Sequence, residues 1–178
     1  MNIARLVKKA KKGNKDALLQ LIMIEKDAYY RLAFTYMRNE HDALEAMDEM
    51  IVTVYEKISS LKKNEAFYSW SKTILVNSCK TLLRNRKKVI YLDDMATVNG
   101  ESTLTKDPYH SSEQAIVMEE LLSHVNEYQR EAIQLKYFHD LDYQTISEMT
   151  DVSVGTVKSR VFQGLKKLRL HYRGDDDE

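Results

Sequence analysis

The chain has 178 residues, enough for one domain or two small ones, and its 43% apolar content allows a packed core. Its formal net charge is zero, so charge alone predicts no polyanionic partner, and its single cysteine, Cys79, excludes an internal disulfide. With one proline and five glycines the composition favours helices, and it shows neither an apolar signal core nor a membrane-spanning run. We therefore expect a soluble intracellular protein.

Charge is arranged in blocks along the chain. Residues 1–15, 71–88 and 153–173 carry only basic charges, whereas residues 40–56 carry only acidic charges apart from one histidine. Alternating blocks of one sign suggest several partner surfaces, although chance clustering of surface charge remains an alternative. The histidines are scattered and no Cys/His spacing resembles a metal site, so we expect no metal and no cofactor.

The pattern of apolar residues divides the chain into segments. Residues 1–91 predict helices with short breaks at "KKGNKD" and "SSLKKNE", and helical periodicity resumes over residues 113–173. Residues 92–112 lack this periodicity and contain the only proline, which is typical of a linker. The acidic end, 174–178, is expected to be disordered. The sequence thus predicts an all-α fold of two small helical domains joined by a flexible linker.

Residues 40–58 predict an amphipathic helix. On a helical wheel one face is apolar, formed by Leu44, Met47, Ile51, Val54, Tyr55 and Ile58. The opposite face is acidic and carries Asp42, Glu45, Glu49 and Glu56. This acidic face is either solvated or a docking surface for a basic or mixed-charge protein. Catalysis or metal binding would need further groups, and the sequence supplies none.

Residues 66–88, "AFYSWSKTILVNSCKTLLRNRKK", predict a second amphipathic helix. Phe67, Leu75 and Leu82 share the side that is expected to pack inward. The opposite stripe is polar and basic, with Trp70 at its edge, and contains Thr73, Asn77, Lys80, Arg84 and Lys88. Cations neutralise phosphates, Asn reads base edges, and an exposed aromatic stacks on an unpaired base. The stripe therefore suits nucleic acid, and the alternative is a core helix with a buried Trp70 and solvated bases.

The segment "DYQTISEMTDVSVGTVKSRVFQGLKKLR" predicts a helix-turn-helix. Asp142 is positioned to cap a short helix and Ser153 a longer second helix. The second helix places Val157, Val161, Leu165 and Leu168 on its inner face, and Gly155, Lys158, Ser159 and Phe162 on its outer face. Small polar and basic residues facing outward near a capped N-terminus are what reading of the major groove requires. A plain helical hairpin is the alternative.

Together these motifs resemble one family. The helix-turn-helix, preceded by "EYQREAIQLKYF", resembles region 4 of extracytoplasmic-function (group 4) sigma factors of RNA polymerase. The segments "YRLAFTYMRNEHDALEAMDEMIVTVYEKI" and "AFYSWSKTILVNSCKTLLRNRKK" resemble their region 2. The resemblance implies a bacterial cytoplasmic protein that binds core polymerase, recognises the −35 element and opens the −10 element. It also implies binding of region 2 to the clamp of the largest subunit, binding of region 4 to the flap, and control by an anti-sigma factor.

The resemblance assigns roles to residues of this chain. Core binding falls on Asp42, Glu45, Asp48 and Glu49. Recognition of the −10 element, with a base pocket at residues 61–65, falls on Lys62, Lys63, Asn64, Trp70, Asn77, Lys80, Arg84 and Lys88. Recognition of the −35 element falls on Ser153, Thr156, Lys158, Ser159, Arg160, Phe162, Gln163 and Lys166.

Some features depart from the family pattern. The loop "KKNE" lacks the glycine often found there, and Gln163 stands where a basic residue is common. The basic N-terminal arm lies outside the motifs and receives no function. Two other functions remain open, namely a helix-turn-helix regulator that binds DNA unaided, with a sensor or dimerisation domain, and a helical protein-interaction adaptor. An enzyme and a small-molecule substrate are not expected, because no nucleophile–base set appears.

Overall fold

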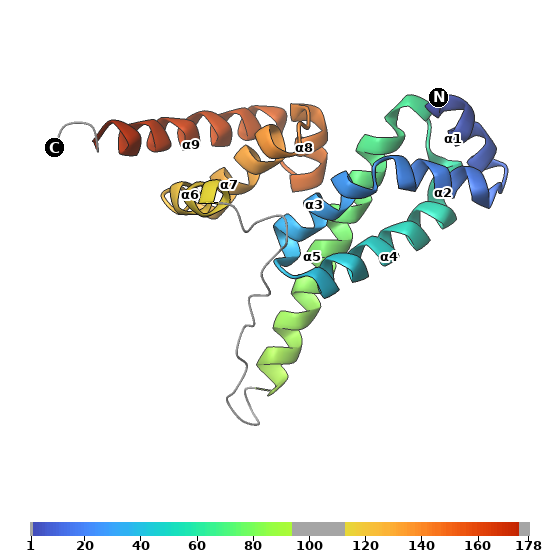
Figure 1. Ribbon diagram of the computed structural model, residues 1–178, viewed down its shortest axis with the longest axis horizontal. Helices are drawn as coiled ribbons and strands as arrows, with labels where there is room; N and C mark the ends of the chain where they lie inside the picture. The colour runs from blue at the N-terminus through green and yellow to red at the C-terminus, as the bar shows by residue number, and fades with distance from the viewer. Residues whose placement is uncertain (1, 94–112, 175–178) are drawn as a thin grey trace. The chain divides into compact units, whose positions relative to one another are not determined.

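A computed structural model describes residues 2–93 and 113–174 of the chain. The chain divides into two compact units, one within residues 1–105 and one within residues 106–178, and each is described by itself. All regular structure in the described residues is helical, which confirms the predicted all-α fold (Figure 1). Most of the predicted linker (92–112) and tail (174–178) lies outside the described residues, so these boundaries stay predictions.

None of the described helices combines the length and the apolar character needed to cross a membrane.

The N-terminal unit begins with two short helices, α1 (Ile3–Lys11) and α2 (Lys15–Ile24). The side chains of Asn2 and Asn14 cap them by accepting bonds from the backbone N–H groups of Arg5 and Ala17. Between the helices Gly13 has φ +88°, a conformation that glycine adopts without a steric penalty. The break predicted at "KKGNKD" is therefore confirmed.

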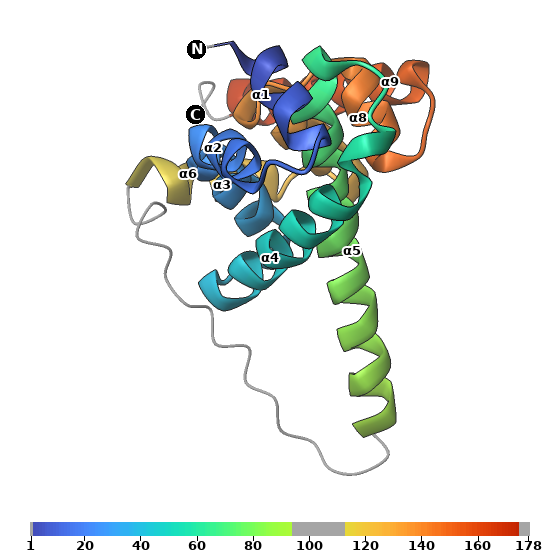
Figure 2. The same cartoon turned by 90° about the vertical axis from the view of Figure 1, so that its right-hand side faces the viewer.

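Three longer helices complete this unit: α3 (Lys26–Met37), α4 (Glu40–Lys57) and α5 (Phe67–Asp93). The predicted break at "SSLKKNE" is present as two 3₁₀ turns, η1 (Ile58–Ser60) and η2 (Asn64–Ala66). A further break at Glu25 was not predicted, whereas the break at the left-handed residue Arg38, followed by the cap Asn39, agrees with the helix predicted over residues 40–58. Both views show the C-terminal part of α5 projecting beyond α4 (Figures 1 and 2).

The core of this unit lies where α4 and α3 pack against each other and against α5. The predicted inner face of α4 is wrong in part, because Leu44 and Tyr55 are 45% and 49% exposed. The apolar residues of α4 that are buried are Ala43, Ala46, Met47, Met50 and Val54. The inner face of α4 thus carries Ala43 and Ala46 in place of Leu44 and Tyr55, and such small side chains allow close packing of neighbouring helices.

The C-terminal unit contains α6 (Glu113–Leu122), α7 (Glu127–Ile133), the π-helical turn η3 (Gln134–Phe138), α8 (Tyr143–Thr150) and α9 (Val154–Gly174). Asn126 and Gln129 form a reciprocal capping box at the start of α7. Helix α9 packs against both α7 and α8. The buried residues Leu122, Val125, Ile133 and Leu168 form one apolar cluster that joins α6, α7 and α9.

Candidate functional sites

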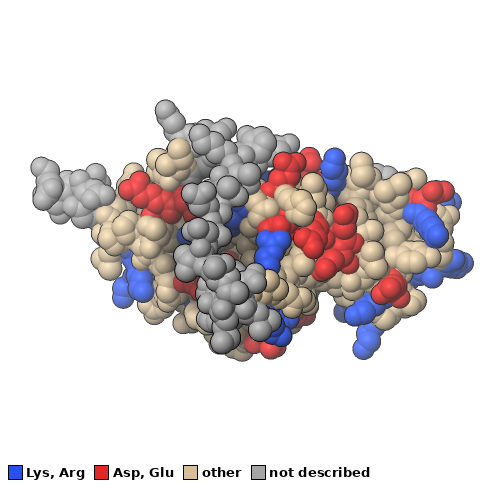
Figure 3. Space-filling view, turned by 90° about the horizontal axis from the view of Figure 1, so that it is seen from below, with Lys and Arg blue, Asp and Glu red and all other residues tan. Residues whose placement is uncertain are grey.

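The first candidate site is the acidic face of α4. Asp48 and Glu49 are exposed and Glu45 is partly exposed, so these three carboxylates are accessible to a partner. The space-filling view shows a group of Asp and Glu side chains near the middle of the visible face, with other acidic side chains elsewhere on it (Figure 3). Such a concentration of one sign of charge favours and steers approach of a basic surface.

Asp42 was predicted to face outward with these acids, and this is wrong. Its side chain is only 8% exposed, and its carboxylate accepts hydrogen bonds from both terminal nitrogens of Arg86 on α5. The side-chain amide of Asn39 donates to the same carboxylate. These bonds, led by that of Arg86, hold the pKa of Asp42 well below its ordinary value. The carboxylate of Asp42 therefore links α4 to α5. A helical wheel considers one helix at a time, so it could not predict Arg86 as the partner.

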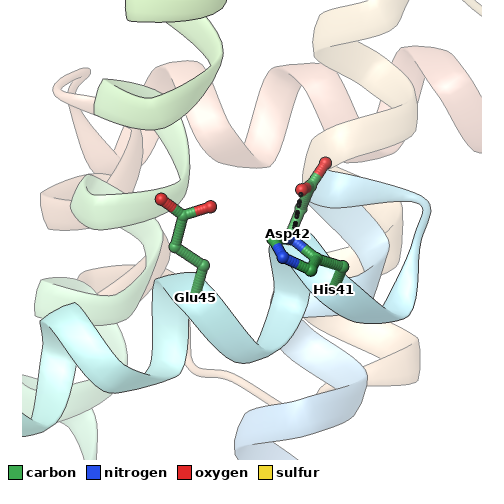
Figure 4. A group of neighbouring side chains, drawn as sticks. All are labelled: His41, Asp42 and Glu45. Atoms are coloured by element: carbon green, nitrogen blue, oxygen red, sulfur yellow. Dashed lines mark hydrogen bonds and ion pairs between the residues drawn. The ribbon is translucent and has the colours of Figure 1, made fainter.

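The same region contains a possible metal-binding group. His41, Asp42 and Glu45, from the first turns of α4, offer ligand atoms within 4.8 Å of one another (Figure 4). Arg86 already binds the Asp42 carboxylate and lies 3.7 Å from a Glu45 oxygen. A cation would have to displace this guanidinium, so the group fits an ion-pair cluster better than a metal site.

The second candidate site begins at the loop between α4 and α5, residues 58–66, here called the capture loop. Ile58 and Leu61 are buried and hold its first half, and Phe67 is buried at its end. Between these anchors Lys62 and Lys63 are exposed and Asn64 is half-buried. The predicted pocket residues are thus carried on a short segment with fixed ends.

The polar stripe of α5 continues from the capture loop. Asn77, Arg84 and Lys88 are exposed, whereas Trp70 is partly exposed and contacts Phe67 with 6.3 Å between ring centroids. Lys80 is half-buried and its Nζ lies 5.8 Å from the centre of the Tyr36 ring. A separation of seven residues places Trp70 and Asn77 on nearly the same side of the helix, about 10 Å apart along its axis. The stripe is therefore continuous, and its aromatic end is neither fully buried nor fully free.

The opposite side of α5 fixes the orientation of the stripe. Phe67, Leu75 and Cys79 are fully buried, and the Ser71 hydroxyl shares a 2.7 Å hydrogen bond with the buried Tyr29 hydroxyl. Burial raises the pKa of the Cys79 thiol to about 12, so it behaves as a small core residue. Because this face is packed and the Ser71–Tyr29 hydroxyl pair is hydrogen-bonded, α5 can adopt only one rotation about its own axis.

The third candidate site is the helix-turn-helix formed by α8 and α9. Asp142 accepts the Thr145 N–H at 2.8 Å, and Ser153 accepts the Thr156 N–H at 3.1 Å. Both predicted caps are therefore confirmed. Between the helices Asp151 adopts φ +53° and the Ser147 hydroxyl donates to the Val152 carbonyl. This local hydrogen bonding sets the turn.

The predicted faces of α9 are also confirmed. Val157, Val161 and Leu168 are buried, whereas Phe162 is 65% exposed. The other residues predicted to face DNA are exposed, except for the half-buried Arg160: Ser153, Thr156, Lys158, Ser159, Gln163 and Lys166. Hydroxyl, amide, cation and aromatic groups are thus presented by one helix face, the range of contacts that base edges and phosphates accept.

The structure adds residues that the sequence did not indicate. An open pocket of about 490 Å³ lies between the start of α7 and the outer face of α9, and Tyr128 and Asn126 are among its lining residues. The guanidinium of Arg160 lies 4.7 Å from the centre of the Tyr128 ring, and Lys158 Nζ lies 5.6 Å from that of Tyr143. These aromatic rings hold two of the predicted DNA-binding cations in place. Residues so far from α9 in sequence carry no local signal of this role.

The sequence matches two known family profiles. The profile described as sigma-70 region 2 matches residues 21–89, and the one described as sigma-70, region 4, matches residues 116–168. The first therefore contains the acidic face, the capture loop and the whole stripe, and the second contains α8 and most of α9.

Several curated proteins are similar over nearly the whole chain. The RNA polymerase sigma factor SigV of Bacillus subtilis is 31% identical over 168 residues, which cover 94% of this chain and 98% of SigV. The ECF RNA polymerase sigma factor SigW of the same organism is 30% identical over 183 residues, covering 97% and 98% of the two chains.

Solved structures share the fold. CnrH, solved in complex with the cytosolic domain of CnrY, has a TM-score of 0.68 at 18% identity and 99% coverage of both chains. The sigma factor RpoE of Bartonella quintana, solved with the anti-sigma factor NepR, has a TM-score of 0.67 at 20% identity. That match covers 86% of this chain and 95% of RpoE.

Proposed function

The chain belongs to the extracytoplasmic-function family of RNA polymerase sigma factors, and on this premise we propose how its parts share promoter recognition. A protein of this family binds core polymerase and promoter DNA and starts transcription at particular promoters. One observation carries the residue-level proposal: the same chain presents an exposed polar stripe on α5 and a capped, outward-facing recognition helix, α9.

The N-terminal unit opens and reads the −10 element. Lys62, Lys63, Arg84 and Lys88 attract the phosphates, while Asn77 offers an amide to a base edge. A base that leaves the duplex stack gains contacts at the capture loop, and opening costs a few kcal/mol per base. We therefore expect A·T-rich −10 sequences. Partial exposure of Trp70 supports a place for it at the border of this site.

The C-terminal unit reads the −35 element through the N-terminal half of α9. Lys158, Ser159 and Gln163 face the base edges, and Phe162 contacts a thymine methyl group. Arg160 and Lys166 bind phosphates, the former held by Tyr128. Because polymerase carries both units, contact of one unit with its element makes contact of the other effectively intramolecular.

The acidic face of α4 is the site for core polymerase. Exposure of Glu45, Asp48 and Glu49 supports their contact with the clamp of the largest subunit, and region 4 is assigned to the flap. Asp42 contributes through its bond to Arg86 and not through the partner. The chain itself is proposed to have no catalytic activity, because bond formation between nucleotides belongs to the core enzyme.

Control by another protein completes the proposal. CnrH and RpoE, which share this fold, were solved with the cytosolic domain of CnrY and with the anti-sigma factor NepR. We assign this chain an anti-sigma factor too, and place its action in the bacterial cytoplasm, where core polymerase works.

One experiment tests the function. The protein is mixed with bacterial core polymerase on a library of randomised promoter templates, and the transcripts are sequenced. Transcripts that start at a shared −35/−10 pair and need both components are expected. Tight binding to duplex DNA without core polymerase, together with no promoter-specific transcripts in its presence, would instead identify a helix-turn-helix regulator that acts alone.

A further inference from the structure

Helix α1 lies against the capture loop, although the sequence assigned it no function. It packs on α2, η1 and η2, and its residues Val7 and Ala10 are buried. Its basic side chains do not behave alike. Lys8, Lys9 and Lys12 are exposed, whereas Lys11 is half-buried and turned toward the loop.

Lys11 joins two points of the capture loop. Its Nζ donates to the Leu61 carbonyl at 2.5 Å and to Asn64 Oδ1 at 3.2 Å. These partners are 50 and 53 residues away in sequence, so the bonds fix tertiary geometry and do not belong to local helix structure. A cationic donor forms stronger hydrogen bonds than a neutral one. The polar middle of the loop is thereby tied to α1 as well as to the core.

The bond to Asn64 also orients its side-chain amide. An asparagine amide has an acceptor oxygen at one end and a donor NH₂ at the other. Because Oδ1 accepts from Lys11, Nδ2 is the end of this amide that can donate to another partner. A base that approaches this end of the amide meets a hydrogen-bond donor. Bases that present an acceptor toward Asn64 are therefore favoured.

We propose that Lys11 is a positioning residue for recognition of the −10 element: it holds the capture loop and sets the Asn64 amide so that its donor end faces the unstacked base. This proposal rests on the proposed function of the loop. Without Lys11, the amide is free to turn over and the loop keeps only its apolar anchors, so discrimination among −10 bases weakens while affinity for core polymerase stays.

The test compares Lys11→Met with wild type. Methionine keeps an apolar stem of similar length and removes the charged donor. Each protein is assembled with core polymerase on templates that carry one fixed −35 element and every base at each −10 position. We expect the preference at one −10 position to relax roughly fivefold, the size of one typical net hydrogen bond. The −35 preference should stay unchanged.

Two variants serve as controls. Lys9→Met removes an exposed cation from the same helix and should keep the wild-type −10 preference. Lys11→Arg restores a cationic donor at the same position and should keep more of the wild-type −10 preference than Lys11→Met does. Circular dichroism melting confirms folding of each variant, and Lys11→Gln, which shortens the donor and removes its charge, replaces Lys11→Met if that variant does not fold.

Two results would overturn the proposal. In the first, Lys11→Met keeps the wild-type −10 preference; in the second, it lowers transcription by the same factor on every −10 sequence, as a purely structural role predicts. Failure of the proposed function is separate, because wild-type protein would then yield no promoter-specific transcripts with core polymerase.

Discussion

At the scale of single residues, the contact most sensitive to mutation joins Asp42 to Arg86. Arg86→Met leaves the Asp42 carboxylate, on a side chain that is only 8% exposed, without its cation. Because the Arg86 side chain is 44% exposed, solvent screens part of the interaction, and we expect a loss of roughly 1–3 kcal/mol of unfolding free energy. Thermal denaturation followed by circular dichroism measures it, with Lys87→Met, an exposed neighbour, as the control.

The pH dependence of this loss follows from the lowered pKa of Asp42. Its ordinary value is 3.8, and Arg86 lowers it in the folded state, so the stabilisation is present above pH 4. The stabilisation falls as the pH drops through the folded-state pKa, where the native carboxylate also takes up a proton. The difference in melting temperature between wild type and Arg86→Met should therefore shrink from pH 6 toward pH 2. If the difference in melting temperature stayed constant over that range, the charge interaction between Asp42 and Arg86 would not be its cause.

At the scale of helices, charge reversal on α4 tests the docking face. Asp48→Lys with Glu49→Lys replaces two exposed acids by bases, and we expect affinity for core polymerase to fall by about tenfold or more. The paired control is Asp16→Lys with Asp27→Lys, which reverses two exposed acids on α2 and α3. Binding to labelled core polymerase at two salt concentrations measures both. Equal affinity of wild type and the α4 variant would show that this acidic face is only solvated and does not bind core polymerase.

The same helix shows where sequence reasoning reaches its limit. The wheel correctly predicted an amphipathic helix with Met47 and Val54 inside, but it placed Leu44 inside and Asp42 outside. A wheel orders side chains by polarity, whereas burial also depends on how closely the backbones approach and on charged partners from other helices. Arg86 lies 44 residues beyond Asp42, so no local pattern links them.

The helix-turn-helix was easier to predict because its signals are local. Asp142 and Ser153 each bind a backbone N–H three residues ahead, and such caps can be recognised from spacing alone. The aromatic supports of Arg160 and Lys158 come from α7 and α8, and only the tertiary structure brings them together. The contact between Lys11 and the capture loop also joins residues far apart in sequence, so no local pattern predicts it.

Gly164 offers a test of how α9 packs on α7. A Cβ at this position would lie 2.7 Å from Ile133 Cδ1 and 3.2 Å from Gln129 Cβ. Alanine gains about 1 kcal/mol of helix propensity but overpacks a buried contact at about 1–3 kcal/mol, so Gly164→Ala should destabilise the C-terminal unit by roughly 1 kcal/mol. Hydrogen exchange of α7 and α9 amides measures this.

Gly155 is the matched control, since it lies in the same helix and a Cβ there meets only Ser153 Oγ at 3.8 Å. Gly155→Ala should slow exchange in α9 instead of accelerating it. If both variants slow exchange, the close approach at Gly164 does not restrict packing.

At the scale of the whole molecule, the order of segments was predictable. Capped helices, a segment without periodicity and a second helical block indicated two units, and the described residues form two units. Their joint action was not derivable from pattern alone, because it depends on polymerase holding both on one promoter. The resemblance to a family supplied this step, and the two matched profiles support it.

The division of labour between the units predicts independent defects. Asn77→Ala should lower transcription about tenfold by weakening −10 recognition, and Lys158→Ala should lower it by a similar factor at the −35 element. Residues on separate units without shared partners contribute additively to the free energy, so the double variant should lose about a hundredfold. Asn85→Ala, another exposed asparagine of α5, should change little. Run-off transcription with saturating core polymerase measures all four proteins.

Promoter changes separate the two defects further. A change of the −35 base that Lys158 contacts should lower wild-type transcription but add little to the loss already caused by Lys158→Ala, whereas it should add fully to the loss caused by Asn77→Ala. Additivity of this kind follows because each variant removes contacts to one element only. If Asn77→Ala became insensitive to the −35 mutation, the two units would not read separate elements, and the assignment of α5 to the −10 element would fail.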